Sequence, residues 1–250
     1  MAIAGPDVAL IEQPDGPSRA TSDDAVPDVV HLWARAAQLG ILGTSRGPGA
    51  PPSVRVSDRA RDAEGRATWR LEIDGVEWGA LRVLTNLLLA RRFDEIVVGT
   101  ENVFTAPFAP ASPSPRTPRP ARVALDTLTF PRAPARLPFV VTREPIVKAS
   151  RNRAVRVEFS RPLADADVDA VVEALDLWAD LIVWGGYAPS NMEPRESGAL
   201  PEGALLYDET TVAQQFTDAF YCDEAAFDGV IGYALARASQ EPRVVEIAIQ

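Results

Sequence analysis

The hydrophobic residues of 152–186 recur with two different periods, one typical of a strand and one typical of a helix. Residues 153–159 alternate every second position, as in a half-buried strand, and the valines and leucines of 168–175 recur at helical spacings of 3 and 4. Residues 181–184 form a short apolar run before two glycines, which favours a second strand. We therefore predict strand, helix and strand over this stretch.

The pattern continues to the end of the chain. Residues 204–216 have extended character, residues 223–240 carry one apolar helical face, and residues 244–249 are β-rich. The order β-α-β-β-α-β is that of a ferredoxin-like sandwich, with two helices over one face of an antiparallel sheet. We therefore predict an α+β fold with a C-terminal ferredoxin-like domain, and this fold alone implies no function.

The N-terminal half shows similar elements. We predict a helix from residue 29 to 39, a hairpin of strands 53–56 and 67–73, a buried helix within 79–93, and a strand over 93–98. This half is therefore also predicted to be α+β.

Short stretches of the two halves match. Residues 70–73 resemble 156–159, and residues 93–98 resemble 178–183, at nearly the same offset. A tandem repeat explains this match, and so does the hydrophobic pattern that all βαβ units share. The sequence leaves both explanations open.

Proline and charge divide the chain into four parts. Residues 1–28 carry scattered prolines without a sustained period and are predicted to be a mobile tail. The N-terminal half then spans 29–106, and a proline- and arginine-rich connector with short strands spans 107–150. The acidic ferredoxin-like domain spans 151–250.

Composition narrows the class of protein. With 46% hydrophobic and 24% charged residues, the 250-residue chain suits a soluble globular protein. Its apolar runs are far shorter than the roughly 20 residues that cross a bilayer, so we expect no membrane partner. A single cysteine and no signal-like start favour the cytoplasm.

Charge is distributed unevenly within the net value of −10. Residues 115–156 hold 10 basic and 2 acidic residues, whereas residues 157–250 hold 4 basic and 18 acidic residues. The basic segment either pairs with the acidic domain inside the molecule or leaves that domain free for a partner.

One acidic face is predicted on the helix within 152–186. Asp169, Glu173 and Asp176 follow at spacings of 4 and 3, opposite the valine and leucine stripe. Like charges one turn apart are destabilising by a few tenths of a kcal/mol. A solvated face explains them, and so does a docking surface for a basic protein.

Motifs for catalysis and cofactors are missing. The chain has no Walker loop, no G-x-G-x-x-G and no G-x-S-x-G, and His31 is its only histidine. The aspartates at 165, 167 and 169 lack the glycine and final glutamate of a calcium loop, so they indicate a helix start. The thiol of Cys222 precedes two acidic residues, which favours an inert cysteine. We expect no cofactor and no metal.

Nucleic acid is an unlikely partner on charge grounds. The arginines of the connector have few aromatic residues beside them for base stacking. The acidic C-terminal domain would also repel a phosphate backbone.

These observations favour a non-enzymatic interaction protein, such as an inhibitor or an antidote-like protein. It would bind a basic protein partner through Asp169, Glu173 and Asp176. The alternative is a small-molecule enzyme or ligand-binding protein. Its pocket would be formed by Trp184, Tyr187, Asp208 and Glu209.

Overall fold

The structure of the chain is a computed structural model. The described residues are 2–11, 25–44, 48–56, 60–61, 67–90, 95–98, 102–105, 122–124, 128–144, 152–189, 200–217 and 222–250.

The C-terminal half is a ferredoxin-like unit, as predicted. Its strands run in the order β11-β12-β9-β13, and each neighbouring pair is antiparallel. The short strand β10 extends the β11 side of the sheet, and β8 adds a parallel strand beside β13. The elements are β8 (Val140–Arg143), β9 (Arg153–Phe159), α3 (Asp165–Val183), β10 (Leu200–Pro201), β11 (Leu205–Asp208), β12 (Thr211–Thr217), η3 (Glu224–Phe227), α4 (Asp228–Ala236) and β13 (Val244–Ile249).

Alternating apolar residues hold this sheet to its helices. Strand β9 turns Val155, Val157 and Phe159 inward, where each is almost fully buried. The ring of Trp178 on α3 packs edge-on against Phe216 of β12 at 5.1 Å, and its Nε1 donates to the Ala226 carbonyl at 2.6 Å. The aromatic residues of α3, β12 and η3 therefore form the centre of the unit.

The predicted strand at 181–184 is wrong. Residues 181–183 are the last turn of α3, and Trp184 is its C-cap. This helix is buried on one side by the sheet and on another by α1, so its apolar residues nearly surround its last turns. A short run that is apolar on all sides does not distinguish a strand from a buried helix.

The N-terminal half has the same strand order. Its path β2-β4-β1-β5 is antiparallel throughout, with β3 beside β4 and with β6 and β7 beyond β5. The elements are β1 (Ala2–Ile11), α1 (Ala25–Gln38), β2 (Ser53–Val56), β3 (Ala60–Arg61), β4 (Ala67–Glu77), α2 (Gly79–Ala90), β5 (Glu95–Val98), β6 (Asn102–Thr105) and β7 (Arg122–Ala124).

Two expectations for this half differ from the structure. The mobile tail predicted over 1–28 contains the central strand β1 and the start of α1, while residues 12–24 lie outside the described residues. The matched stretches are also not equivalent, because 70–73 lies in β4, whose place in its sheet corresponds to that of β12, whereas 156–159 lies in β9. A common ancestor for the two units stays a prediction.

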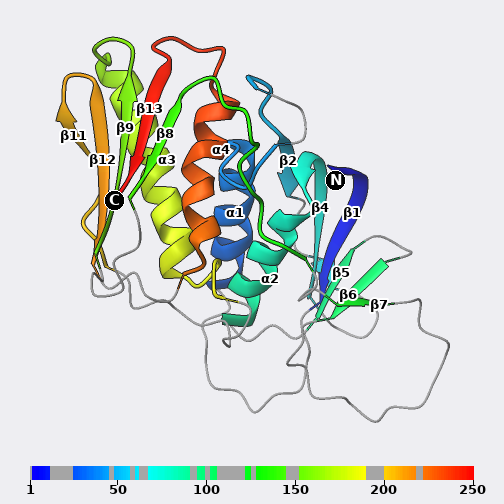
Figure 1. The fold of residues 1–250 in the computed structure, drawn as a ribbon. Helices are drawn as coiled ribbons and strands as arrows, with labels where there is room; N and C mark the ends of the chain where they lie inside the picture. The colour runs from blue at the N-terminus through cyan, green and yellow to red at the C-terminus, as the bar shows by residue number, and fades with distance from the viewer. Residues whose placement is uncertain are drawn as a thin grey trace, which may run out of the picture.

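The two units face each other through their helices. Figure 1 shows one sheet on each outer side and the helices α1, α2, α3 and α4 between them, in the layer order sheet, helices, helices, sheet. The contact is close: a Cβ added at Gly232 of α4 would lie 2.5 Å from the carbonyl oxygen of Gly40. Asn86 of α2 also donates to the carbonyl of Gly186 at 3.1 Å. Buried residues of both units therefore form one continuous core.

Residues 128–139, here called the strap, cross between the two units. Phe130 is buried, and the guanidinium of Arg82 lies 4.2 Å above its ring while donating to the Leu128 carbonyl at 2.6 Å. Gly79 allows the strap backbone to approach, because an added Cβ would lie 2.5 Å from the Thr129 carbonyl oxygen. The strap then leads into β8, so the predicted connector strands are present as β7 and β8 at sheet edges.

Candidate functional site

The predicted acidic face is part of a longer stripe along α3. Five carboxylates at spacings of 4, 4, 3 and 4 share one side of the helix. We call them the acidic stripe: Asp165, Asp169, Glu173, Asp176 and Asp180. The helix begins at Asp165, so the aspartates at its start are helical residues and not a calcium loop.

Two of the three predicted partner-binding residues have contacts inside the chain. Glu173 forms an ion pair with Arg35 of α1 at 3.0 Å. Asp176 accepts a hydrogen bond from the backbone N–H of Ala204 at 2.8 Å. Asp169 is exposed, and no hydrogen bond or ion pair reaches its carboxylate from the described part of the chain.

The contact of Asp176 fixes the edge of the C-terminal sheet. Strands β10 and β11 lie on the same side of β12 and are separated at Gly203, whose φ of +81° places it in the left-handed region. The hydrogen bond to Ala204 holds the chain against α3 directly after this break. Asp176 therefore has a structural role beside β11.

Strand β11 is an exposed edge. Among the described strands it pairs only with β12, and all four of its residues are exposed. Leu205, Leu206 and Tyr207 are 49%, 43% and 59% exposed, which is unusual for large apolar side chains. An edge strand offers unpaired backbone N–H and C=O groups to another chain.

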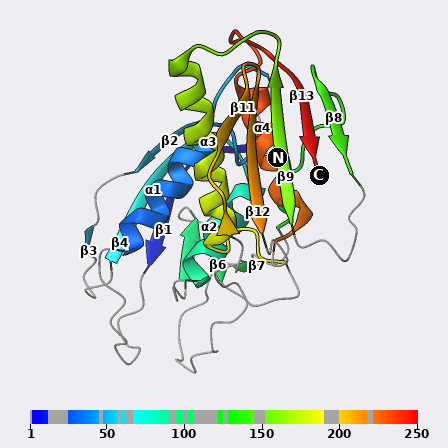
Figure 2. The same cartoon turned by 90° about the vertical axis from the view of Figure 1, so that its left-hand side faces the viewer.

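The stripe and the edge lie next to each other. Figure 2 shows α3 between α1 and β11, and contacts join α3 to both elements. Burial raises the pKa of Asp180, and the carboxylate of Asp176 raises it further. This side of the unit therefore combines mutually repelling carboxylates with an apolar strand that has a free edge.

The alternative pocket does not assemble. Tyr187 is buried near the C-terminal end of α3, where its carbonyl accepts from the N–H of Asp223 at 2.7 Å. Glu209 lies at the N-terminal end of this helix, because its carbonyl accepts from the N–H of Leu163 at 3.0 Å. The 19 residues of α3 separate these ends by roughly 28 Å.

The other two residues of this predicted pocket also lie at opposite ends of α3. Trp184 is half-buried at the C-cap of α3. Asp208 is exposed at the β11–β12 turn, and the backbone N–H of Thr210, which donates to it at 2.8 Å, lowers its pKa. Asp208 therefore stabilises a turn on the outside of the sheet.

The basic segment does pair with the acidic domain. Arg132 of the strap lies 3.5 Å from Asp223, and Arg153 of β9 lies 2.8 Å from Glu224. Arg143 of β8 forms an ion pair with Asp228, the first residue of α4. Such pairing was one of the two interpretations that the uneven charge left open, and no spacing in the sequence indicated which residues meet.

The remaining reactive groups do not form a site. His31 is exposed on α1. Burial raises the pKa of the Cys222 thiol to about 12, and Glu224 and Asp223 contribute to the increase while Arg153 opposes it. No group of three or more histidine, cysteine or acidic residues could hold a metal ion within the described ranges.

Comparisons with protein-family models, with curated proteins and with solved structures each found no match for the chain. Within the described helices, none has the length and apolar character needed to cross a membrane.

Proposed function

We propose that the chain is a non-enzymatic interaction protein, inhibitor-like or antidote-like, that binds a basic and extended segment of a partner protein. The segment would add a strand to β11, while its basic side chains meet the acidic stripe. The observation that carries this proposal is the adjacency of the exposed edge strand and the five carboxylates of α3.

Strand addition explains the exposed residues of β11. An added strand hydrogen-bonds through its main chain, and its alternate side chains meet the surfaces beside the edge. Leu206 pairs with the fully buried Val212, so its side chain lies on the helix side of the sheet, towards α3. Apolar side chains of the partner would cover Leu206 on this side.

Charge complementarity explains the stripe. Glu173 already has a guanidinium partner, which leaves Asp165, Asp169 and Asp180 for external cations. A cation near Asp180 would offset the repulsion from Asp176 that raises its pKa. The predicted binding surface is therefore shifted: Asp169 stays in it, Asp165 and Asp180 join it, and Glu173 and Asp176 support it from inside the chain.

The cytoplasmic location is part of this proposal. Its support is the single cysteine, which cannot form an intramolecular disulfide and is half-buried.

A short capped peptide of alternating arginine and valine tests the proposed function. Isothermal titration should show saturable binding that weakens steeply with added salt. The double variant Asp169→Asn/Asp180→Asn should bind roughly tenfold more weakly, since each exposed ion pair contributes up to about 1 kcal/mol. The matched control Glu72→Gln/Glu144→Gln removes the same charge from an exposed position on β4 and from an exposed position directly after β8, and it should bind like wild type.

Two further peptides test the charge match with the acidic stripe and the main-chain pairing with β11 separately. Replacing arginine by glutamate removes the charge match, and methylating the backbone nitrogens removes the main-chain donors. Each peptide should lose binding. Equal binding by the arginine and glutamate peptides, or equal binding by both pairs of variants, would contradict the proposal.

A further inference from the structure

Two cavities lie on either side of the strap, where it crosses α4. One has a volume of about 390 Å³ and the other about 500 Å³, within the usual range for small-molecule sites. Both are lined by Arg132, Ala133, Pro134 and Asp228. We call the two cavities together the cleft. Neither the acidic stripe nor β11 contributes to it.

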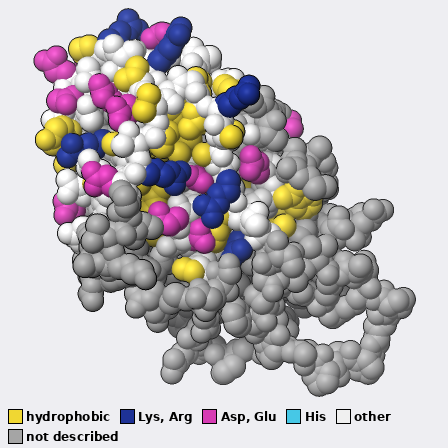
Figure 3. All heavy atoms as spheres, viewed as in Figure 1, with side chains coloured by type: hydrophobic (Ala, Val, Ile, Leu, Met, Phe, Trp, Pro, Cys, Tyr) yellow, Lys and Arg dark blue, Asp and Glu magenta, His cyan; other side chains and the backbone are white. Residues whose placement is uncertain are grey.

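The walls of the cleft are mainly apolar. Proline and aliphatic side chains of the strap, β8 and α4 face the two cavities, and Gly232 brings the α4 backbone to the wall. Figure 3 shows an apolar patch over α4 on this face, with basic and acidic side chains around it. The apolar wall residues include Pro131, Pro134, Leu137, Val141, Ile231 and Leu235.

The charged groups of the cleft favour an anion. Asp228 is only 7% exposed at its side chain and is neutralised by Arg143 and by Arg132, the latter at 3.7 Å. It therefore has little attraction left for a cation. Arg136 lines the cavity of about 390 Å³, is exposed, and has no ion-pair partner among the described carboxylates.

One further carboxyl group lines the cleft beside these arginines. Glu77 ends β4 and is half-buried in the wall beside Gly43. Burial raises its pKa, so its charged form is disfavoured there.

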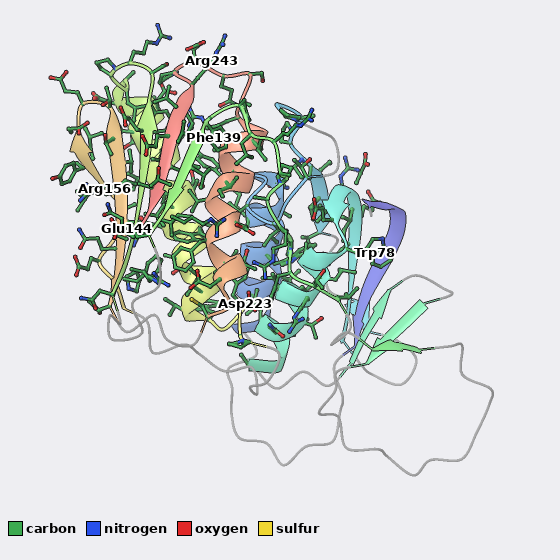
Figure 4. The ribbon with its side chains drawn as sticks, viewed as in Figure 1. Trp78, Phe139, Glu144, Arg156, Asp223 and Arg243 are labelled. Carbon is green, nitrogen blue, oxygen red and sulfur yellow. The ribbon has the colours of Figure 1, made fainter. Side chains whose placement is uncertain are left out.

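The position of the cleft also suits a ligand. It lies between the two units, and domain junctions are preferred positions for small-molecule sites. Figure 4 shows Phe139 where the strap turns into β8, and Asp223 at the opposite end of α4. The strap is held at Phe130 and again at β8, so its middle forms a fixed wall over α4.

We propose that the cleft binds a small organic acid, with the acid group on Arg136 and an apolar body against the strap and α4. A purely inorganic anion would leave the proline and aliphatic walls uncovered, and a neutral apolar molecule would leave Arg136 without a partner. Only a molecule with an acid group and an apolar body contacts both Arg136 and the apolar walls of the cleft.

A series of probes tests this site. Benzoate, 4-phenylbutyrate, octanoate and naphthalene-1-sulfonate are titrated by calorimetry, each beside its uncharged alcohol or amide. At least one acid should bind saturably with one site per chain, and its uncharged counterpart should bind at least tenfold more weakly. Absence of binding by every acid, or equal binding by acid and neutral probe, would overturn the proposal.

Variants of the chain then test whether the acid binds in the cleft. Arg136→Gln should weaken the acid at least tenfold, whereas the matched control Arg161→Gln, an exposed arginine in the β9–α3 loop, should leave affinity unchanged. Ala133→Leu should also weaken binding, because it fills space that both cavities share. Unchanged affinity in Arg136→Gln, or equal loss in both arginine variants, would overturn the assignment.

This test is independent of the proposed function. The arginine–valine peptide should bind Arg136→Gln as it binds wild type, since Arg136 lies on the strap and not beside β11. Loss of peptide binding in this variant would show that the two surfaces are not separate.

Discussion

Acidic side chains of the C-terminal unit have two different environments. At the start of α4, Asp223, Glu224 and Asp228 are each within ion-pair distance of an arginine from the basic segment. Along α3, Glu173 alone has an arginine partner among the described residues, and this partner is Arg35 of α1. The described arginines of the basic segment that form ion pairs reach acids at the start of α4, and none of these pairs reaches α3, so chain topology decides which acids they neutralise. The comparison teaches that a net charge identifies neither the paired nor the free carboxylates.

The largest expected effect on stability concerns the acids at the start of α4 that pair with arginines. Asp228→Ala removes a nearly buried carboxylate that contacts Arg132 and Arg143. We expect the free energy of unfolding to fall by about 2–3 kcal/mol, since hydrogen bonds to charged groups contribute about 1.5–3 kcal/mol and both arginines keep access to water. Urea unfolding measures this loss. Asp169→Ala is the control and should stay within about 0.5 kcal/mol of wild type; a comparable loss in the control would remove the contrast between the two environments.

The one ion pair of the stripe should be weak. Arg35 and Glu173 are 49% and 57% exposed at their side chains, and exposed pairs contribute about 0.2–1 kcal/mol. A double-mutant cycle with Arg35→Ala and Glu173→Ala should give a coupling energy in this range that falls further at high salt. The same cycle with Arg143→Ala and Asp228→Ala should give a larger coupling energy. A larger coupling energy for Arg35 and Glu173 than for Arg143 and Asp228 would contradict the difference between the two environments.

The smallest expected effect concerns repulsion within the stripe. The pKa of Asp180 is raised by burial and by Asp176, so the folded chain binds this proton more readily than the unfolded chain. Protonation of Asp180 therefore stabilises the folded state as the pH falls through its raised pKa. Asp180→Asn mimics the protonated group and should be more stable than wild type near pH 7 by a few tenths of a kcal/mol.

Thermal unfolding across pH checks this difference. The stability difference between Asp180→Asn and wild type should shrink as the pH falls towards about 4, where the wild-type carboxyl group takes up its own proton. A difference that grows on acidification would contradict the stated cause of the raised pKa.

The sequence predicted the ferredoxin-like fold of the C-terminal unit, and the alternation of β9 was its clearest signal. It took residues 181–184 as the second strand, whereas β11 and β12 are the second and third strands of the pattern. It did not predict β1, which contains Gly5 and Pro6 and pairs with β4 through two register shifts near these residues. It also missed the end of α3, which is apolar on more than one side because helices of the other unit cover it.

The candidate site was predicted only in part. Helical spacing is local, so the acidic face was readable from α3 itself. Arg35 lies 138 positions before Glu173, and Arg132 lies 91 positions before Asp223. Such contacts depend on how the two units and the strap pack, and no local pattern encodes them. The exposed edge of β11 likewise depends on strand order rather than on its own four residues.

Hydrogen exchange at the amides of residues 205–208 tests the central claim most directly. The arginine–valine peptide should slow exchange at these edge amides, because the added strand pairs with their backbone groups. It should leave the amides of β8, at the opposite edge of the same sheet, unchanged. Binding of the peptide without any slowing at 205–208, or with equal slowing at β8, would contradict a docking surface formed by β11 and the acidic stripe.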